Sequence, residues 1–319
     1  MIVVTGAAGF IGSNIITGLN KLGITNILAV GDLSDGHKFK NLAVCDYRDY
    51  LDYEDFIERV MANDQFAEPI EAIFHEGACS DTTEWDGRYM MQNNYEYTKI
   101  LFHYCLKHKI QFLYASSAAV YGGSEVFKES DEVQTPLNVY GYSKWKFDQY
   151  MQPYLADAES QVVGFRYFNV YGPQEQHKGT MSSVAFHFMN QLFDNDVVKL
   201  FEGCHGYSDG EQLRDFVSID DVVKVNLWFY KNKDKRGIYN LGTGKARSFN
   251  DVAKALIQQH GSGKIEYIPF PDHLKSAYQS FTQADISKLR DIAGYTEKFD
   301  SLEQGLEKYY RWYCDQKKL

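Results

Sequence analysis

The chain has 319 residues, a formal net charge of −10 and a hydrophobic fraction of 44%. This length allows one large domain or two ordinary ones, with room for a sizeable core and a deep cleft. The acidic balance argues against a nucleic-acid partner, because non-specific binding to a polyanion needs a basic surface that displaces counterions. Any anionic ligand must therefore be held locally, by a few basic side chains and helix N-termini.

The apolar runs are too short to cross a membrane, and the longest of them, such as 110–120, are strand-sized and contain polar residues. The given sequence opens on a strand and a glycine loop, so we expect no signal peptide. The cysteines are scattered, with no pair at metal-ligand spacing: Cys45, Cys79, Cys105, Cys204 and Cys314. We therefore expect a cytoplasmic protein with no membrane partner, no disulfide framework and no metal site.

The first half of the chain alternates strand-like apolar runs with helix-like segments. In chain order, they are a strand at 2–5, a helix at 11–22, a strand at 27–30, an irregular charged stretch, a helix at 55–61, a strand at 72–75, a helix at 90–108, a strand at 112–115, a helix at 139–154 and a strand at 162–165. Continuous apolar strands that alternate with helices indicate a parallel sheet covered on both faces.

Beyond residue 173 the pattern loosens, and no repeat or flexible linker separates the two halves. Helices are predicted at 182–193, 220–230, 249–260 and 302–314, with strand-like pieces between them. We predict an α/β fold with a Rossmann-type doubly wound parallel sheet in residues 1–168. A smaller mixed α/β substrate-binding domain follows in 169–319, a segment near 215–242 returns to the first domain, and a cleft lies between the two.

A glycine loop joins the first strand to the first helix. Gly6, Gly9 and Gly12 have the spacing GxxGxxG. Glycines at such a junction allow a tight turn and a close approach of the backbone to a pyrophosphate, and the helix N-terminus supplies free N–H groups. A glycine triplet alone is weak, but between an apolar strand and an apolar helix it predicts a nicotinamide dinucleotide site.

The residues after the second strand bear on the choice between NAD and NADP. Asp32 suits the 2′-hydroxyl of NAD, whereas Lys38 and Lys40 suit the 2′-phosphate of NADP. The two lysines are equally well explained as solvated loop charges. We favour NADP, because Gly31 stands where the first acid usually lies, and Asp32 keeps NAD open.

Tyr140 and Lys144 form a Tyr-x-x-x-Lys pair, whose side chains share one helical face. A free tyrosine has a pKa of about 10, and a neighbouring ammonium together with a nicotinium ring would favour the phenolate. Ser117 follows a strand at the carboxyl edge of the predicted sheet and can donate a hydrogen bond to a reacting oxygen. These three residues predict proton transfer at a substrate hydroxyl during reversible redox chemistry.

The order of glycine loop, strand-end serine, Tyr-x-x-x-Lys and Asn169-Val-Tyr-Gly-Pro173 resembles the extended short-chain dehydrogenase/reductase superfamily. Within it, the chain resembles the ADP-L-glycero-D-manno-heptose 6-epimerase family nearly end to end. The stretches that carry this closer resemblance are His75–Ser80, Thr82–Asp86, Phe165–Pro173, His177–His187, Phe201–Gly203, Arg214–Phe216, Ile265–Pro271 and Tyr278–Asp285. Enzymes of this family set the C6″ configuration of the heptose precursor for the lipopolysaccharide inner core.

The resemblance implies roles for residues that the pattern alone does not assign. The cofactor would be lined by Phe10, Ile11, Glu76, Gly77, Ala78, Cys79, Ser80, Asn93, Lys144, Val170 and Lys178. The ADP-heptose would be lined by Asn169, Thr180, His187, Phe201, Glu202, Gly203, Cys204, Arg214 and Tyr278. Tyr140 and Lys178 would be the acid/base pair, and the enzyme would be a homo-oligomer, typically of five copies.

Some positions depart from the family pattern. Gly31-Asp32 stands where Asp-Asn is usual, and Tyr53 stands where a lysine is common. Cys204 replaces a serine, and the loop 206–212 is expanded. The first two departures bear on the cofactor, and the other two bear on the substrate loop.

The implied chemistry explains a second acid/base group. C6″ carries a hydroxyl and is not acidic, so inversion needs hydride removal, a transient ketone and hydride return to the opposite face. The oxygen moves between the two steps, so Tyr140 would serve one position and Lys178 the other. The alternative for Lys178 is a binding contact only. Arg214 would bind the pyrophosphate, since arginine does so bidentately.

Two other functions stay open. The first is another nucleotide-sugar epimerase, reductase or dehydratase of the same superfamily, although Ala118-Ala119 after Ser117 replaces the carboxylates that elimination would need. The second is a non-catalytic dinucleotide sensor, which would have no use for Ser117, Tyr140 and Lys144. ADP-heptose epimerisation is the favoured hypothesis.

Overall fold

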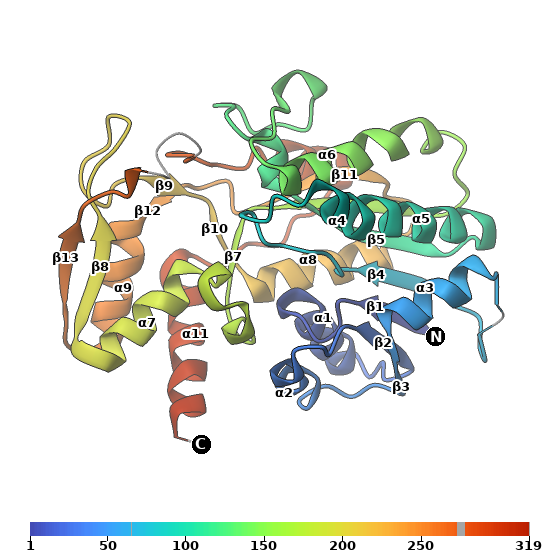
Figure 1. Ribbon diagram of the computed structural model, residues 1–319, viewed down its shortest axis with the longest axis horizontal. Coiled ribbons are helices and arrows are strands. Elements are labelled where there is room, and N and C mark those ends of the chain that lie inside the picture. Colours follow the sequence, from blue (N-terminus) through green and yellow to red (C-terminus); the bar gives the residue numbers. More distant parts are fainter. Residues whose placement is uncertain (65, 273–277, 319) are drawn as a thin grey trace.

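The computed structural model describes residues 1–64, 66–272 and 278–318. Its largest element is a seven-stranded parallel sheet in the order β11-β6-β5-β4-β1-β2-β3 (Figure 1). The strands are β1 (Ile2–Thr5), β2 (Ile27–Gly31), β3 (Asp49–Asp52), β4 (Ala72–His75), β5 (Gln111–Ser117), β6 (Val162–Tyr167) and β11 (Gly237–Leu241). β1, β2, β4, β6 and β11 are buried along their whole length, which explains their continuous apolar sequences. The predicted Rossmann-type fold is confirmed.

Two helical layers cover this sheet. One apolar core joins its first face to α1 (Phe10–Lys21) and α8 (Ile219–Lys231). A second core joins its other face to α3 (Tyr53–Met61), α5 (Tyr97–His108) and α6 (Val139–Met151). In the upper part of Figure 1 α6 and α5 lie near β11 and β5, and lower down α1 lies near β1 and β2. The carboxyl ends of the strands are left uncovered by these layers, and the candidate site is built there.

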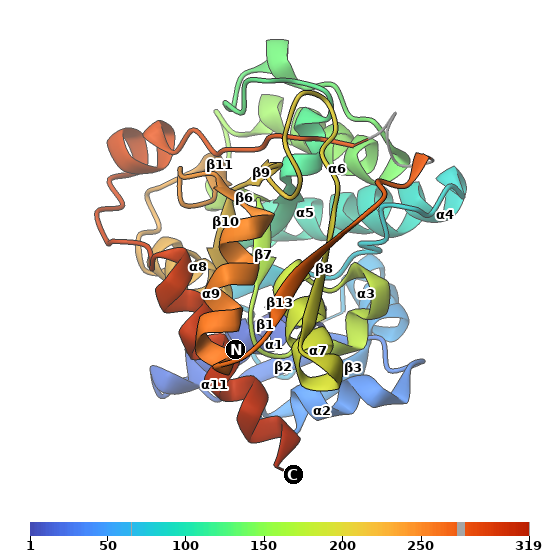
Figure 2. The same ribbon diagram turned by 90° about the vertical axis from the view of Figure 1, so that its left-hand side faces the viewer.

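The remaining elements form a smaller mixed α/β part. Its strands pair as β7 (Asn169–Tyr171) with β10 (Phe216–Ser218), β8 (Val197–Phe201) with β13 (Lys264–Ile268), and β9 (Leu213–Arg214) with β12 (Arg247–Ser248). The helices α7 (Val184–Asn195), α9 (Phe249–His260) and α11 (Leu302–Lys317) share a third apolar core with β8 and β10 (Figure 2). The segment that contains α8 and β11 packs with the first sheet, whereas the exact domain boundaries stay a prediction.

The structure differs from the sequence prediction in two places. The stretch considered irregular contains a turn of 3-10 helix (Gly36–Lys38), α2 (Phe39–Leu42) and β3. β3 lies at the sheet edge with its side chains partly exposed, so it lacks the apolar signal of the central strands. The helix predicted at 90–108 is divided into α4 (Gly87–Met91), a π-helical segment (Gln92–Glu96) and α5.

No helix in the described part of the chain is both long enough and apolar enough to span a membrane. Within the same residues, no group of three or more His, Cys, Asp or Glu side chains is arranged to hold a metal ion.

Candidate active site

The glycine loop lies between β1 and α1, where two glycines make close backbone contacts. Gly6 has a φ of 65°, and a Cβ on it would come within 2.7 Å of the Glu76 carbonyl carbon. A Cβ on Gly9 would lie 3.0 Å from the Gly6 carbonyl oxygen. Gly9 is also the N-cap of α1 and has no side chain to occupy the first N–H groups. This cradle fits a dinucleotide pyrophosphate, whose charge the helix N-terminus stabilises.

The loop after β4 lies at the point where the strand order reverses, between β1 and β4. Asn94 holds this loop, because its amide donates to the Cys79 carbonyl and accepts from the Cys79 N–H, both at 2.9 Å. Asn94 also donates to the Ser143 hydroxyl at 3.1 Å. Asn93, predicted from the resemblance, donates to a carbonyl of its own helix instead. Asn94 lies in a π-helical segment, a conformation that often occurs at functional sites. The sequence pattern predicted neither this segment nor the role of Asn94.

The other residues predicted to contact the cofactor begin α1, follow β4 or lie in β7, which pairs with β10 outside the large sheet: Phe10, Ile11, Gly77, Ala78, Ser80 and Val170.

Asp32 follows β2, as a ribose-binding acid should, and it pairs with Lys38. The Asp32 carboxylate accepts from the Ser34 N–H at 2.7 Å and lies 3.4 Å from the Lys38 ammonium. Burial acts to raise the pKa of Asp32, but the hydrogen bonds from Ser34 and the charge of Lys38 together lower it. Asp32 is therefore ionised at neutral pH, with the lysine beside it. Lys40 is exposed.

Tyr140, Lys144 and Ser117 converge where α6 starts beside the end of β5. The Asn138 side chain caps α6, which places Tyr140 in its first turn. The Tyr140 phenol interacts with the Ser117 hydroxyl. The Lys144 ammonium donates to the Ala115 carbonyl oxygen of β5 at 2.8 Å. The structure thus brings together the three residues that the motif order predicted.

Burial is the largest influence on the pKa values of Tyr140 and Lys144. Burial raises the pKa of Tyr140, and the charges of Cys79 and Glu76 add to that, while the contact with Ser117 opposes it. Burial lowers the pKa of Lys144 to about 8, although Glu76 is among the acids that oppose the shift.

Glu76 is an acidic neighbour that the resemblance treated only as part of the cofactor lining. Its Oε1 accepts from the Tyr167 hydroxyl at 3.0 Å, and Asn226 donates to that hydroxyl at 3.1 Å. Its Oε2 is buried and has no hydrogen-bond partner in the described structure. Burial raises the pKa of Glu76 to about 7, against the opposing effects of Tyr167 and Lys144.

Lys178 lies on the segment after β7 and faces the start of α1. Its ammonium is 5.4 Å from the centre of the Phe10 ring. Burial lowers the pKa of Lys178, and the Glu175 carboxylate opposes that change. Lys178 therefore lies close to the glycine loop, and in the described residues no hydrogen bond or ion pair connects it to Tyr140.

Arg214 is a buried cation in the smaller part of the protein, with 8% of its surface exposed. Its guanidinium lies 4.8 Å from the centre of the Tyr278 ring and 5.6 Å from that of Phe249. It donates to the Leu213 carbonyl at 2.9 Å. No carboxylate of the described chain forms an ion pair with it, and burial lowers its pKa. A buried charge of this kind needs an anion.

The predicted substrate loop gathers around this arginine. Phe201 and Tyr278 both contact Phe270, with ring centres 5.2 and 4.9 Å apart. Cys204 contacts Gln212, and the expanded loop closes through a hydrogen bond from Gly210 to the Phe201 carbonyl.

The remaining predicted substrate residues are spread more widely. Glu202 and Gly203 continue from β8, and the Gly203 N–H donates to Asp209. His187 lies in α7 with its ring 3.4 Å from the Thr180 carbonyl oxygen, and Asn169 is an exposed residue of β7.

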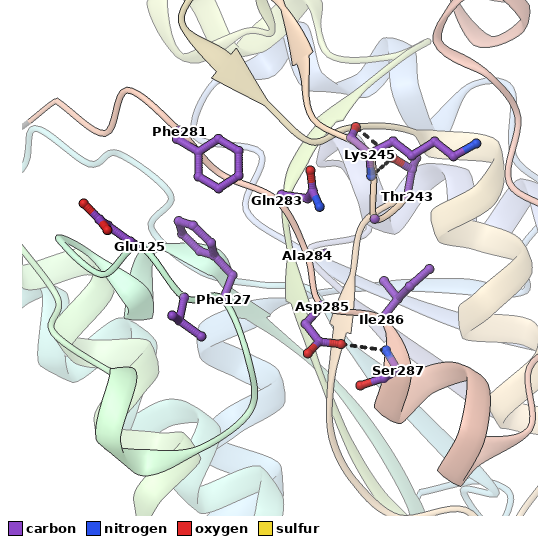
Figure 3. Close-up of a pocket in the computed structure, with 12 residues that line it drawn as sticks. Glu125, Phe127, Thr243, Lys245, Phe281, Gln283, Ala284, Asp285, Ile286 and Ser287 are labelled. Atoms are coloured by element: carbon purple, nitrogen blue, oxygen red, sulfur yellow. Dashed lines mark hydrogen bonds between the residues drawn. The ribbon is translucent and has the colours of Figure 1, made fainter. Parts of the chain in front are cut away.

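Figure 3 shows the residues that line a separate pocket, where the Phe127 and Phe281 rings meet edge to face. Its other labelled residues include Thr243, Lys245 and Asp285, and none of the residues predicted for the active site lines it.

Comparison with known proteins agrees with this geometry. The model of the NAD dependent epimerase/dehydratase family matches residues 2–242. The chain is 57% identical over 309 residues to the ADP-L-glycero-D-manno-heptose-6-epimerase of Alkalilimnicola ehrlichii, covering 97% of this chain and 96% of that protein.

Two solved structures are also similar. The ADP-L-glycero-D-manno-heptose-6-epimerase of Helicobacter pylori is 31% identical, with a TM-score of 0.85 over 98% of this chain and 95% of that one. The structure of MoeE5 in complex with UDP-glucose and NAD is 25% identical, with a TM-score of 0.77 over 99% of both chains. The resemblance seen in the sequence is confirmed: the chain belongs to the NAD dependent epimerase/dehydratase family and is a homologue of the ADP-L-glycero-D-manno-heptose-6-epimerases.

Proposed function

We propose that this protein converts ADP-D-glycero-D-manno-heptose to ADP-L-glycero-D-manno-heptose by inverting C6″, a step of lipopolysaccharide core biosynthesis. The observation that carries the proposal is the buried Arg214 guanidinium, which has aromatic neighbours and no carboxylate partner among the described residues. Arginine binds phosphate groups bidentately, so the diphosphate of a nucleotide sugar supplies the missing charge. The 57% identity to an enzyme of this name supports the choice of sugar.

Proton transfer is assigned to Tyr140. In its ionised form Tyr140 takes the proton of the 6″-hydroxyl as hydride leaves C6″, while Ser117 holds the reacting oxygen by a hydrogen bond. A bound nicotinamide dinucleotide supplies the hydride acceptor and donor. Lys144, fixed on the Ala115 carbonyl at 2.8 Å, brings a positive charge to the same sheet edge.

Lys178 is proposed as the second acid/base group. Inversion requires the ketone to present its other face, so the oxygen occupies two positions relative to the protein. Lys178 belongs to a different segment from Tyr140 and lies by the glycine loop, over Phe10. Burial lowers its pKa, which makes proton release by the ammonium easier near neutral pH.

NADP is the proposed cofactor. Lys38 ends the short 3-10 helix that follows β2 and lies 3.4 Å from Asp32. Because its ammonium is partly exposed, it can pair with a 2′-phosphate in place of the Asp32 carboxylate. Asp32 opposes this choice because its ionised carboxylate repels a phosphate. Family membership by itself supports only a nicotinamide dinucleotide.

The test is incubation of the purified protein with ADP-D-glycero-D-manno-heptose, followed by NMR of the C6″ configuration. Appearance of the L-glycero epimer supports the proposal. If ADP-heptose is unchanged while UDP-sugars are epimerised, the protein is another nucleotide-sugar epimerase. If no sugar nucleotide is turned over and a dinucleotide still binds, the protein is a sensor.

A further inference from the structure

Glu175 is a buried carboxylate that none of the roles above uses. It is 0% exposed, and no lysine, arginine or histidine of the described chain forms an ion pair with it. Burying a charge is costly unless hydrogen bonds compensate for it. Donors from both ends of one segment, Gly172–Ser183, compensate here, and the Tyr309 hydroxyl of α11 also lies against the carboxylate.

The carboxylate joins the two ends of that segment. Oε1 accepts from the Gly172 N–H at 3.1 Å and from the Ser183 hydroxyl at 2.7 Å. Oε2 accepts from the Ser183 N–H at 2.5 Å. Charge-assisted bonds of this kind are shorter and stronger than neutral ones. The side chain of Glu175 therefore closes the segment into a loop whose ends cannot separate without exposing a buried charge.

The backbone of Glu175 holds the middle of the same loop. Its carbonyl oxygen accepts from the Lys178 N–H at 3.0 Å and from the Ser182 hydroxyl at 3.0 Å. Lys178 is thus bonded directly to the residue that closes the loop. The apex beyond it, Gly179 and Thr180, is exposed.

The residue before Glu175 attaches this loop to the dinucleotide domain. Gln174 is buried and has a φ of 74°, an uncommon value for a residue with a side chain. Its Oε1 accepts from the Ser13 hydroxyl of α1 at 2.5 Å, and its carbonyl accepts from the Asn41 amide at 3.0 Å. Asn41 also donates to the Ala8 carbonyl of the glycine loop at 3.0 Å.

We propose that Glu175 is the positioning residue for Lys178: its carboxylate closes the Gly172–Ser183 loop and so fixes the position of the lysine relative to the glycine loop. This proposal rests on the proposed role of Lys178 in epimerisation. Glu175 acts through the lysine and touches neither substrate nor cofactor.

The primary test is Glu175→Gln in a double-mutant cycle with Lys178→Met. The glutamine amide places an N–H₂ group, itself a donor, against the N–H and hydroxyl groups that donate to the carboxylate. We therefore expect the loop to open. Misplacement of a reacting group by about 1 Å can lower turnover about 10²-fold, so we expect kcat to fall by about that factor with KM little changed. The double variant should be no slower than Lys178→Met alone, because both changes act through one lysine. Effects that multiply in the double variant would overturn the proposal.

The matched control is Asp221→Asn on α8. Asp221 is another buried carboxylate, bonded to the Asp300 N–H at 2.7 Å and to Lys224 at 2.8 Å. It should lose comparable stability and keep its kcat. A kcat loss for Glu175→Gln no larger than that of Asp221→Asn would show a structural role only. If Glu175→Gln does not fold, Ser183→Ala can replace it, because this change removes only the hydroxyl donor to Glu175. Its effect on kcat must then add nothing to that of Lys178→Met in the double variant.

A second readout does not depend on the substrate. Reductive methylation with formaldehyde, followed by mass spectrometry of peptides, measures how accessible the Lys178 amine is. Opening of the loop should raise Lys178 labelling several-fold in Glu175→Gln, and labelling equal to that of the unchanged protein would overturn the proposal. If labelling rises in Glu175→Gln but the unchanged protein does not epimerise ADP-heptose, Glu175 does position Lys178 and the proposed function is wrong.

Discussion

The Lys144 ammonium donates a hydrogen bond of 2.8 Å to the carbonyl oxygen of Ala115, on the strand that also presents Ser117. The lysine of the Tyr-x-x-x-Lys pair is therefore tied to the sheet edge by the protein's own backbone. Gly141 allows this approach, because a Cβ there would lie 2.7 Å from the Ala119 carbonyl oxygen. A site assembled in advance loses little conformational entropy at the moment of reaction.

Tyr140→Phe should abolish most turnover without unfolding the protein. The change removes the proton carrier and keeps the ring, so kcat should fall by about 10²-fold or more, the scale of acid/base catalysis. Steady-state kinetics and the dinucleotide content of the purified variant are the measurements. Tyr142→Phe is the control, because Tyr142 is 41% exposed on the same helix. Near-normal epimerisation by Tyr140→Phe would contradict the assignment.

Lys178→Met should lower kcat and leave KM nearly unchanged if the lysine transfers a proton. Methionine keeps most of the side-chain length but carries no proton. Dismutation of an aldehyde analogue should be lost in step with epimerisation, since both need two proton-transfer positions. Lys199→Met, at an exposed position of β8, is the control. A rise in KM alone would make Lys178 a binding contact.

The dinucleotide released from the denatured protein should be mostly NADP. Mass spectrometry identifies it directly, and a predominance of NAD would refute the proposal. Asp32→Asn should raise the preference for NADP over NAD, because it removes the ionised carboxylate that lies 3.4 Å from Lys38. Asp35→Asn changes a second carboxylate of the same loop, which pairs with His37 instead, and should leave the preference unaltered.

Arg214→Gln should weaken nucleotide-sugar binding without destabilising the ligand-free protein. Hydrogen bonds to charged groups contribute about 1.5–3 kcal/mol, so KM should rise at least about tenfold. The free energy of unfolding should not fall, because the change removes a buried cation that has no carboxylate partner in the described structure. Urea unfolding and titration with ADP measure the two effects. A large loss of stability with unchanged ADP affinity would assign Arg214 a structural role.

His75 should make the protein less stable in mild acid. The ring is buried between the Thr5 and Thr98 hydroxyls at 2.7 and 2.8 Å, and burial lowers its pKa to about 3 from 6.5. Below about pH 6.5 the unfolded chain binds a proton that the folded chain excludes, so stability falls as pH drops from 6.5 towards 3. The contribution reaches about 1.4 kcal/mol per pH unit.

The check is urea unfolding of the unchanged protein and of His75→Gln between about pH 7 and about pH 5. The unfolding free energy of the variant should depend less steeply on pH, because up to one proton fewer is taken up on unfolding. Equal slopes would mean that His75 is not held neutral by the fold.

Much of the architecture follows from local sequence. The strands at 2–5 and 72–75 and the helix at 249–260 were predicted with the bounds that the structure shows, because buried strands and amphipathic helices have apolar periods that need no distant partner. The glycine loop and the Tyr140–Lys144 pair are local for the same reason, since turn geometry and one helical turn set their spacing. The fold class and the family could therefore be predicted from the sequence alone.

Features that depend on contacts between residues far apart in the sequence became evident only in the tertiary structure. The sequence of the edge strand β3 is too polar for the strand to be predicted from it. The hydrogen bonds between Asn94 and Cys79 join two segments that are separate in the sequence. The raised pKa values of Tyr140 and Glu76 depend on burial at a sheet edge that several strands build together. Whether a polar group is buried, and what then compensates for its lost hydration, is a property of the folded chain and is not encoded in any short stretch of it.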